Sequence, residues 1–272
     1  MKSKSLKLYD RENKRLIVLW QKATPEYWDR HWQTKNLVEK ITEGRNNWFV
    51  RKFTSKFLKK GSRVLEGGCG IGQNVYGLKC WGYEAYGVDF AKETIENVKK
   101  EFPDLNISVQ DVRKLNFPNN FFDGYWSLGV IEHFWNGYEE ILREAGRVIK
   151  PGGYLFLTFP YMSPLRKLKA RMGLYQIFSN KDADKDNFYQ FILDADKVKE
   201  DVKKHGFKFL LEYPYDATKG IKDEISLLRP ILQRIYDSQN IVARSIRSLI
   251  SLLFSKIAGH SILLVFQKNK ID

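Results

Sequence analysis

The stretch 64–74, VLEGGCGIGQN, limits what this chain can fold into more than any other stretch. It reads as the end of a short buried strand, a glycine-rich turn and the beginning of a helix. Glycines at positions 68, 70 and 72 permit positive φ angles and a close approach of the backbone to a ligand. Their G-x-G-x-G spacing differs from the G-x-G-x-x-G of dinucleotide sites, and Glu66 would repel a pyrophosphate. The turn is therefore predicted to hold a ligand with an amine.

Strands and helices alternate through the middle of the chain. The pattern predicts strands at 63–66, 85–89, 107–110, 122–127 and 154–159, with helices at 73–80, 92–101 and 138–148. This order is typical of a parallel sheet with right-handed crossovers. A helix at 196–205 and strands at 207–213 and 261–267 follow. About 40 residues with helical patterning separate the last two strands, which marks an insertion.

Two acids follow the next two predicted strands. Asp89 ends the second strand, 23 positions after Glu66, where a carboxylate can accept from both hydroxyls of a ribose. Asp111 follows the third strand and can accept from an exocyclic amine such as that of adenine, with Phe90 and Val112 beside the ring. An amine, a ribose and an adenine together describe S-adenosylmethionine. The structural alternatives are a tight turn without a ligand and two acids that only cap helices.

The segment 63–160 resembles the class I S-adenosylmethionine-dependent methyltransferases of the small-molecule type. The similar motifs are VLEGGCGIG, YGVDFAKETIENVKK, VQDVRKLNFPNNFFDGYWSLGVIEHF and KPGGYLFLTFP, in the family's order and spacing. The resemblance implies cofactor-binding residues Trp28, Trp32, Glu66, Gly68, Cys69, Gly70, Gly72, Asn74, Asp89, Phe90, Asp111, Val112, Ser127 and Leu128. Two positions depart from the family pattern: Ala91 stands where a hydroxyl residue often caps the next helix, and Glu66 stands where Asp is more frequent.

The resemblance also implies an α/β fold, a Rossmann-like doubly wound seven-stranded sheet, mostly parallel with an antiparallel last strand. We expect residues 1–60 to form an N-terminal helical lid and residues 61–272 to form the methyltransferase domain. In the lid, Thr24-Pro25-Glu26 begins a helix that Gly44 closes, and Asn46 caps a second helix. Helical insertions are expected at about 161–195 and 219–259. The lid and the segment 161–191 are predicted to roof the acceptor site, with Tyr161, Phe188 and Tyr189 as wall residues.

His133 is the candidate catalytic residue, because it follows the fourth strand near the expected position of the transferred methyl and can act as a general base. The alternative is a histidine that only packs or bonds to the backbone. Methyl transfer from a sulfonium needs little base catalysis when the reactants are well placed. The product is S-adenosylhomocysteine, and the acceptor is a small molecule or an amphiphile that the motifs do not identify.

Charge and composition limit the classes of partner that we expect. Lys and Arg number 46 against 32 acidic residues, a formal charge of +14, which favours anionic partners or reflects a solubilising surface. An RNA methyltransferase is the alternative enzyme, supported by the basic run SPLRKLKARMG with Arg166, Lys167, Lys169 and Arg171. A non-catalytic cofactor-binding or membrane-surface protein is the third interpretation. Nucleic acid is the less favoured partner, because no separate nucleic-acid module is found.

The cysteines, the histidines and the lengths of the apolar runs indicate which cellular compartment and which kinds of site to expect. Cys69 lies in the tight turn, so no disulfide framework is expected, and the scattered histidines predict no metal site. No apolar run of roughly 18 residues is present, so neither secretion nor a membrane span is expected. We predict a cytoplasmic protein.

The insertion 219–259 is predicted to contain an amphipathic helix. Its apolar residues fall at 242, 246, 249, 250, 253, 254 and 257, and basic residues outnumber acidic ones across the insertion by seven to three. The stripe either packs on the protein's own sheet or on a second subunit, or it rests peripherally on a membrane surface and brings the site to a lipid-linked acceptor.

Overall fold

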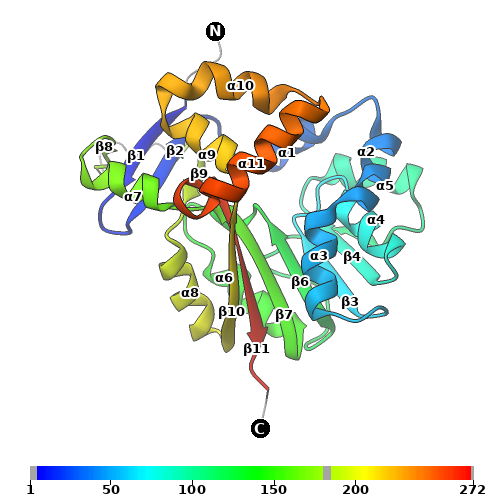
Figure 1. Ribbon diagram of the computed structural model, residues 1–272. Helices are drawn as coiled ribbons and strands as arrows, with labels where there is room; N and C mark the ends of the chain where they lie inside the picture. The colour runs from blue at the N-terminus through cyan, green and yellow to red at the C-terminus, as the bar shows by residue number, and fades with distance from the viewer. Residues whose placement is uncertain (1–4, 180–184, 271–272) are drawn as a thin grey trace.

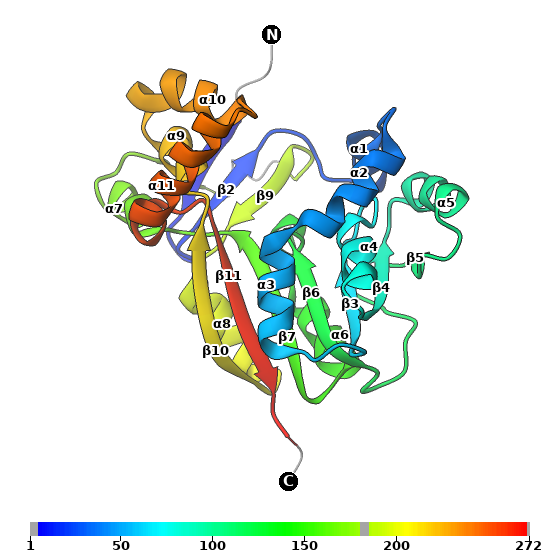
Figure 2. The same cartoon turned by 45° about the vertical axis from the view of Figure 1, so that its right-hand side comes forward.

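The computed structural model describes residues 5–179 and 185–270, which form two sheets with helices around them (Figures 1 and 2). The larger sheet has seven strands in the order β10-β11-β7-β6-β3-β4-β5. They are β3 (Arg63–Gly67), β4 (Glu84–Asp89), β5 (Ile107–Val109), β6 (Phe122–Leu128), β7 (Ile149–Pro160), β10 (Phe207–Tyr215) and β11 (Ser261–Lys268). β11 runs antiparallel to both neighbours, and the other neighbouring pairs are parallel. The predicted fold class is confirmed.

Helices cover both faces of this sheet because successive strand residues point to opposite sides. Leu65 and Tyr125 pack in the core with α6 (Glu139–Val148) and α8 (Ala195–Lys204). Val64 and Trp126 pack in the other core, with α3 (Trp48–Phe57), α4 (Gln73–Cys80) and α5 (Lys92–Glu101). Buried residues of both cores thus pack on the two faces of the sheet and position the carboxyl ends of its parallel strands.

The N-terminal segment differs from the helical lid that we predicted. It begins with a hairpin of β1 (Leu6–Asp10) and β2 (Arg15–Leu19), which joins β8 (Gln176–Ile177) and β9 (Phe188–Ile192) in a second sheet, β8-β1-β2-β9. The segment 161–195 is therefore only partly helical, through α7 (Pro164–Arg171). The Asp10 carboxylate fixes the hairpin turn by accepting from the backbone N–H of Asn13 at 3.1 Å and from Arg15 Nε at 3.0 Å.

The predicted long helix after Thr24 is two helices, α1 (Pro25–Trp32) and α2 (Leu37–Glu43), followed by the short η1 (Gly44–Asn46). Thr24 caps α1 as predicted, since its hydroxyl accepts from Tyr27 N at 3.2 Å. Gln33 has a non-helical ψ of 128° and ends α1. Asn47 caps α3, one residue after the predicted cap.

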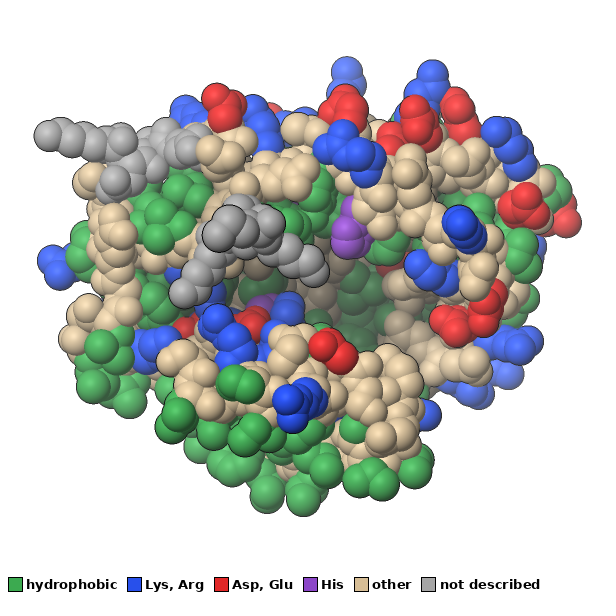
Figure 3. Space-filling view, turned by 90° about the horizontal axis from the view of Figure 1, so that it is seen from above, with side chains coloured by type: hydrophobic (Ala, Val, Ile, Leu, Met, Phe, Trp, Pro, Cys, Tyr) green, Lys and Arg blue, Asp and Glu red, His purple; other side chains and the backbone are tan. Residues whose placement is uncertain are grey.

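The insertion before the last strand is helical as predicted. It contains α9 (Ala217–Glu224), η4 (Ser226–Leu228), α10 (Arg229–Asp237) and α11 (Ile241–Ala258). However, α11 does not pack its apolar stripe on the protein's own sheet. Leu249 and Leu253 are 56% and 59% exposed, whereas the buried residues of α11 are Ala243 and Ala258. Figure 3 shows apolar side chains gathered along this edge of the molecule.

Candidate functional site

The glycine-rich turn between β3 and α4 has the conformation that its sequence predicts. Gly68, Gly70 and Gly72 have φ angles of 75°, 51° and 73°. No larger residue fits at position 70, because a Cβ on Gly70 would lie 2.6 Å from Trp32 Cε2 of α1. Cys69 is a buried free thiol within the turn. The turn therefore presents bare backbone beneath the N-terminal helix.

Glu66 ends β3 with a carboxylate that is only half satisfied. The residue is 2% exposed, and its Oε1 accepts from Asn74 Nδ2 at 2.7 Å. Asn74 is held in turn by Asn47 Nδ2, 2.8 Å from its Oδ1. Oε2 has no hydrogen-bond partner among the described residues. Burial raises the pKa of Glu66 to about 8, so a cationic ligand group would both satisfy Oε2 and favour the ionised form.

Asp89 ties β4 to the turn. Its Oδ2 accepts from Gly70 N at 2.8 Å and its Oδ1 accepts from Ala91 N at 2.9 Å. Burial raises the pKa of the Asp89 carboxyl, although these backbone N–H groups oppose the shift. A carboxylate has about four acceptor positions, so both oxygens keep capacity for hydroxyl donors.

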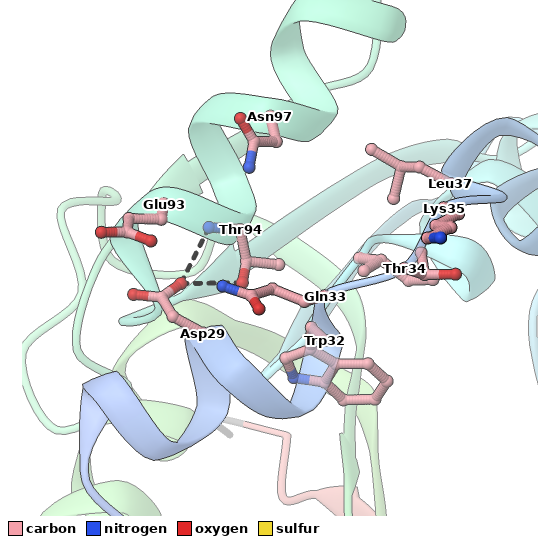
Figure 4. A pocket seen from close by; sticks show the side chains of 10 residues that line it. Asp29, Trp32, Gln33, Thr34, Lys35, Leu37, Glu93, Thr94 and Asn97 are labelled. Carbon is pink, nitrogen blue, oxygen red and sulfur yellow. Dashed lines mark hydrogen bonds between the residues drawn. The ribbon is translucent and has the colours of Figure 1, made fainter.

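A carboxylate from the N-terminal region replaces the helix cap that Ala91 lacks. Asp29 Oδ1 of α1 accepts from both Thr94 N and Thr94 Oγ1 of α5 at 2.8 Å (Figure 4). This contact borders a cavity of about 460 Å³ that lies between α1 and α5. Neither Glu66 nor Asp89 lines that cavity, so it lies beside the predicted cofactor position.

The predicted adenine acid has a partner within the chain. Asp111 is half-exposed and accepts from Arg113, with 2.6 Å between Asp111 Oδ2 and Arg113 Nη2. This hydrogen bond helps hold the pKa of Asp111 below its ordinary value, although burial opposes the shift. Val112 is buried and Phe90 is partly buried. Ser127 is buried with no partner for its hydroxyl among the described residues, and Leu128 lines a cavity at the end of β6.

An aromatic cluster joins α1 to the end of β6. The rings of Trp28 and Trp32 stack with centroids 6.4 Å apart, as the i, i+4 spacing predicts, and Trp28 meets His133 edge-on at 5.1 Å. His133 Nδ1 lies 2.7 Å from the Tyr189 carbonyl oxygen of β9. Burial lowers the pKa of His133 to about 4, so the ring is neutral. Nδ1–H donates to that carbonyl, which leaves a lone pair on Nε2.

A cavity of about 460 Å³ opens at the carboxyl ends of β6 and β7, which we call the acceptor cavity. Its walls include Leu128, Gly129, Glu132, His133, Thr158, Tyr189, Gln190, Asp216, Lys219 and His260. Of the predicted wall residues, Tyr189 lines it, but Tyr161 and Phe188 are buried elsewhere. Sequence reasoning missed Glu132, Asp216, Lys219 and His260, because only the fold brings η2 (Ile131–His133), α9 and β11 together.

The basic run that suggested RNA is engaged within the chain. Arg166 is fully buried, Lys167 pairs with Asp194 at 2.9 Å, and Lys169 pairs with Glu224 at 2.9 Å. The described residues contain no cluster of His, Cys, Asp and Glu suited to a metal ion. Within the same described part of the chain, no helix is both long and apolar enough to cross a membrane.

Comparisons with known proteins agree with this geometry. A methyltransferase domain family matches residues 65–157. A probable S-adenosylmethionine-dependent methyltransferase of Mycolicibacterium smegmatis is 29% identical over 100 residues, which is 37% of this chain and 38% of that protein. Phosphoethanolamine N-methyltransferase 3 of Arabidopsis thaliana is 27% identical over 61% of this chain and 35% of its own length.

The fold also matches solved structures. A protein from Pyrococcus horikoshii superposes with a TM-score of 0.54 at 19% identity, covering 91% of this chain and 97% of that one. The chain thus covers somewhat more than a third of the length of each of the two curated relatives, and nearly the whole length of this solved structure. From its motifs, its sheet topology and these similarities, the chain carries at residues 65–157 a methyltransferase domain of the class I S-adenosylmethionine-dependent type.

Proposed function

We propose that the chain binds S-adenosylmethionine and transfers its methyl group to a small-molecule or amphiphilic acceptor. The observation that carries the proposal is the buried Glu66 carboxylate, whose Oε2 has no partner among the described residues and lies beside bare glycine backbone. The ammonium group of the cofactor fits this position. Asp89 holds the ribose hydroxyls, and Asp111, Val112 and Phe90 surround the adenine.

The lid residues complete the cofactor site. Trp32 of α1 lies against Gly70 of the turn and Trp28 stacks on Trp32, while Leu128 and Ser127 stand at the end of β6. When bound, S-adenosylmethionine supplies a methyl group on a sulfonium, which is a good leaving group. The chain therefore has mainly to orient the acceptor and exclude water. His133 Nε2, with its free lone pair, takes the proton that an O–H or N–H acceptor releases.

Calorimetry with S-adenosylhomocysteine and S-adenosylmethionine tests the cofactor assignment. We expect both nucleotides to bind the full chain. Incubation with candidate acceptors is then followed by mass spectrometry for S-adenosylhomocysteine release, which separates turnover from binding alone. A folded protein that gives no heat with either nucleotide contradicts the proposal.

An amphiphilic acceptor is favoured by the surface of the insertion. The exposed stripe of α11 continues onto α10 and η4 through Ile231 and Leu227, which are 63% and 84% exposed. Arg229, Arg234, Arg244 and Lys256 are exposed on α10 and α11, where Asp237 is the one acidic residue, and this positive charge complements an anionic lipid surface. We infer that this face rests on a membrane, close to the mouth of the acceptor cavity that α9 lines.

A further inference from the structure

A second cavity of about 510 Å³ adjoins the acceptor cavity and shares Tyr189, Gln190, Lys219 and His260 with it. Its other walls include Lys7 of β1 and Arg166 of α7. Four nitrogen-bearing basic side chains thus meet in one hollow, from Lys7 of β1, Arg166 of α7, Lys219 of α9 and His260 just before β11. Lys, Arg and His side chains are visible along one side of the central hollow in Figure 3.

Arg166 fixes the tautomer of His260. Arg166 is fully buried, and its Nη2 lies 3.0 Å from His260 Nδ1. A guanidinium only donates, so Nδ1 must accept, and a neutral His260 carries its proton on Nε2. That Nε2 lies 2.8 Å from Lys219 Nζ. If Lys219 is charged, its ammonium N–H groups and the His260 Nε2–H are both donors, and neither nitrogen can accept a hydrogen bond from the other.

Positive charge exceeds negative charge around this hollow. Three cations line it, Lys7, Arg166 and Lys219, together with one carboxylate, Asp223, which is an excess of two positive charges. Glu224 is already engaged by Lys7 at 2.7 Å, Arg166 at 3.0 Å and Lys169 at 2.9 Å. Asp223 pairs with Lys222 at 3.0 Å.

Burial and neighbouring charges shift the pKa values of the groups in this hollow. Burial and then the charge of Arg166 lower the pKa of His260 well below its ordinary value. Burial also lowers the pKa of Lys7 and of Lys219, although their neighbouring carboxylates oppose the shift. Glu132, which lines the acceptor cavity as Lys219 does, has a pKa raised by burial to about 8 and is mostly protonated at neutral pH. It therefore adds little negative charge.

We propose that this second cavity binds a phosphate group carried by the methyl acceptor, with Lys219 and Lys7 as its donors and the buried Arg166 as a fixed positive charge in its wall. The inference rests on the proposed function and names the acceptor class. A phosphate monoester carries nearly two negative charges at neutral pH and has three acceptor oxygens, which matches the excess of two. With the phosphate at Lys219, the rest of the acceptor extends past Tyr189 toward Gly129 and His133, where the methyl group emerges.

The test titrates the full chain with inorganic phosphate, followed by phosphorus NMR and calorimetry. We expect wild-type binding and a loss of about tenfold or more in Lys219→Met, as removal of one charge-assisted hydrogen bond predicts. Lys203→Met of α8 removes the same charge from an exposed position outside the cavity and should bind phosphate as wild type does. Lys7→Met provides a second variant in case Lys219→Met does not fold.

Binding of S-adenosylhomocysteine, measured on the same samples, keeps the two proposals separate. The phosphate subsite alone is overturned if wild type binds the nucleotide but not phosphate. It is also overturned if Lys219→Met and Lys7→Met both bind phosphate as well as wild type does. Failure to bind the nucleotide overturns the proposed function instead. Displacement of phosphate by glycerol 3-phosphate assigns the site to soluble esters, and displacement only by dihexanoyl phosphatidic acid assigns it to a lipid headgroup.

Discussion

At the scale of single residues, Asp89 is the sharpest test of the cofactor site. Asp89→Ala is expected to weaken S-adenosylhomocysteine binding by about 1–3 kcal/mol, through loss of charge-assisted hydrogen bonds to the ribose. Calorimetry measures the change. Asp104→Ala, at an exposed acid between α5 and β5, is the matched control and should leave the affinity unchanged. Equal affinities of Asp89→Ala and wild type would falsify the ribose assignment.

Glu66 predicts a proton release on binding. Its pKa of about 8, raised by burial from 4.5, leaves it mostly protonated at pH 7 in the free protein, and an ammonium partner would ionise it. We expect up to about one proton to be released with S-adenosylhomocysteine, measured by calorimetry in buffers of different ionisation enthalpy. Glu66→Gln should abolish the release. Glu132→Gln, whose carboxyl has a similarly raised pKa of about 8, should retain it.

The raised pKa of Glu66 also affects the stability of the protein without ligand. The folded state holds a proton on Glu66 that the unfolded chain loses above pH 4.5, so the contribution of Glu66 to the free energy of unfolding should fall as pH rises from about 4.5 to about 8. The free energy of unfolding of wild type, taken relative to that of Glu66→Gln, should therefore fall across this range, as measured by urea unfolding at several pH values. A wild-type free energy of unfolding that stays flat or rises across this range, with Glu66→Gln following the same curve, would contradict the raised pKa.

The positions of Glu66 and Asp89 could be predicted because each ends a strand of a parallel sheet, and such ends meet at one edge. Lys219 and His260 could not, since their meeting depends on the insertion folding back against β11. Arg113 also escaped prediction as the partner of Asp111. Nothing in the sequence distinguishes a local ion pair two residues apart from two solvated charges.

At the scale of elements, the N-terminal helix α1 and α5 are coupled through Asp29. Because its carboxylate caps α5 in place of Ala91, Asp29→Ala should destabilise the fold by about 1 kcal/mol and loosen the lid over Gly70. Thermal unfolding measures the first effect and calorimetry with S-adenosylhomocysteine the second. Glu93→Ala, beside the cap on the same helix, is the control. If Asp29→Ala binds S-adenosylhomocysteine as tightly as wild type does, the position of α1 over Gly70 does not depend on this contact.

The central strands and helices were predicted to within a residue or two at most ends, because each carries its own periodic pattern and turn signals. β7 is longer than predicted, since it begins at Ile149 before the turn at Gly152-Gly153. The β1–β2 hairpin was missed. Its strands are short, and their pairing partners β8 and β9 lie more than 150 residues away in the chain, so local pattern gives little support for them.

At the scale of the whole molecule, α11 has its faces reversed relative to a helix that packs on a core. Its small and polar side, with Ala243, Arg247 and Ser251, faces the protein, and Arg247 Nη1 donates to the carbonyls of Ile235, Tyr236 and Ser238 at the end of α10. The apolar side faces outward. A helix held this way by its polar face is built to present its apolar face to something else.

We therefore expect the protein to sediment with vesicles that contain anionic lipid, more weakly as salt is added and weakly with neutral vesicles. The double variant Leu249→Ser, Leu253→Ser should lose binding, because it removes apolar area that would enter the lipid interface. Leu210→Ser, at an exposed leucine on β10 away from the stripe, is the control. If wild type ignores anionic vesicles at low salt and instead forms a dimer that the double variant breaks, measured by light scattering, the stripe is a subunit interface. The acceptor then needs no membrane, because a second copy of the chain covers the face that lipid was proposed to cover.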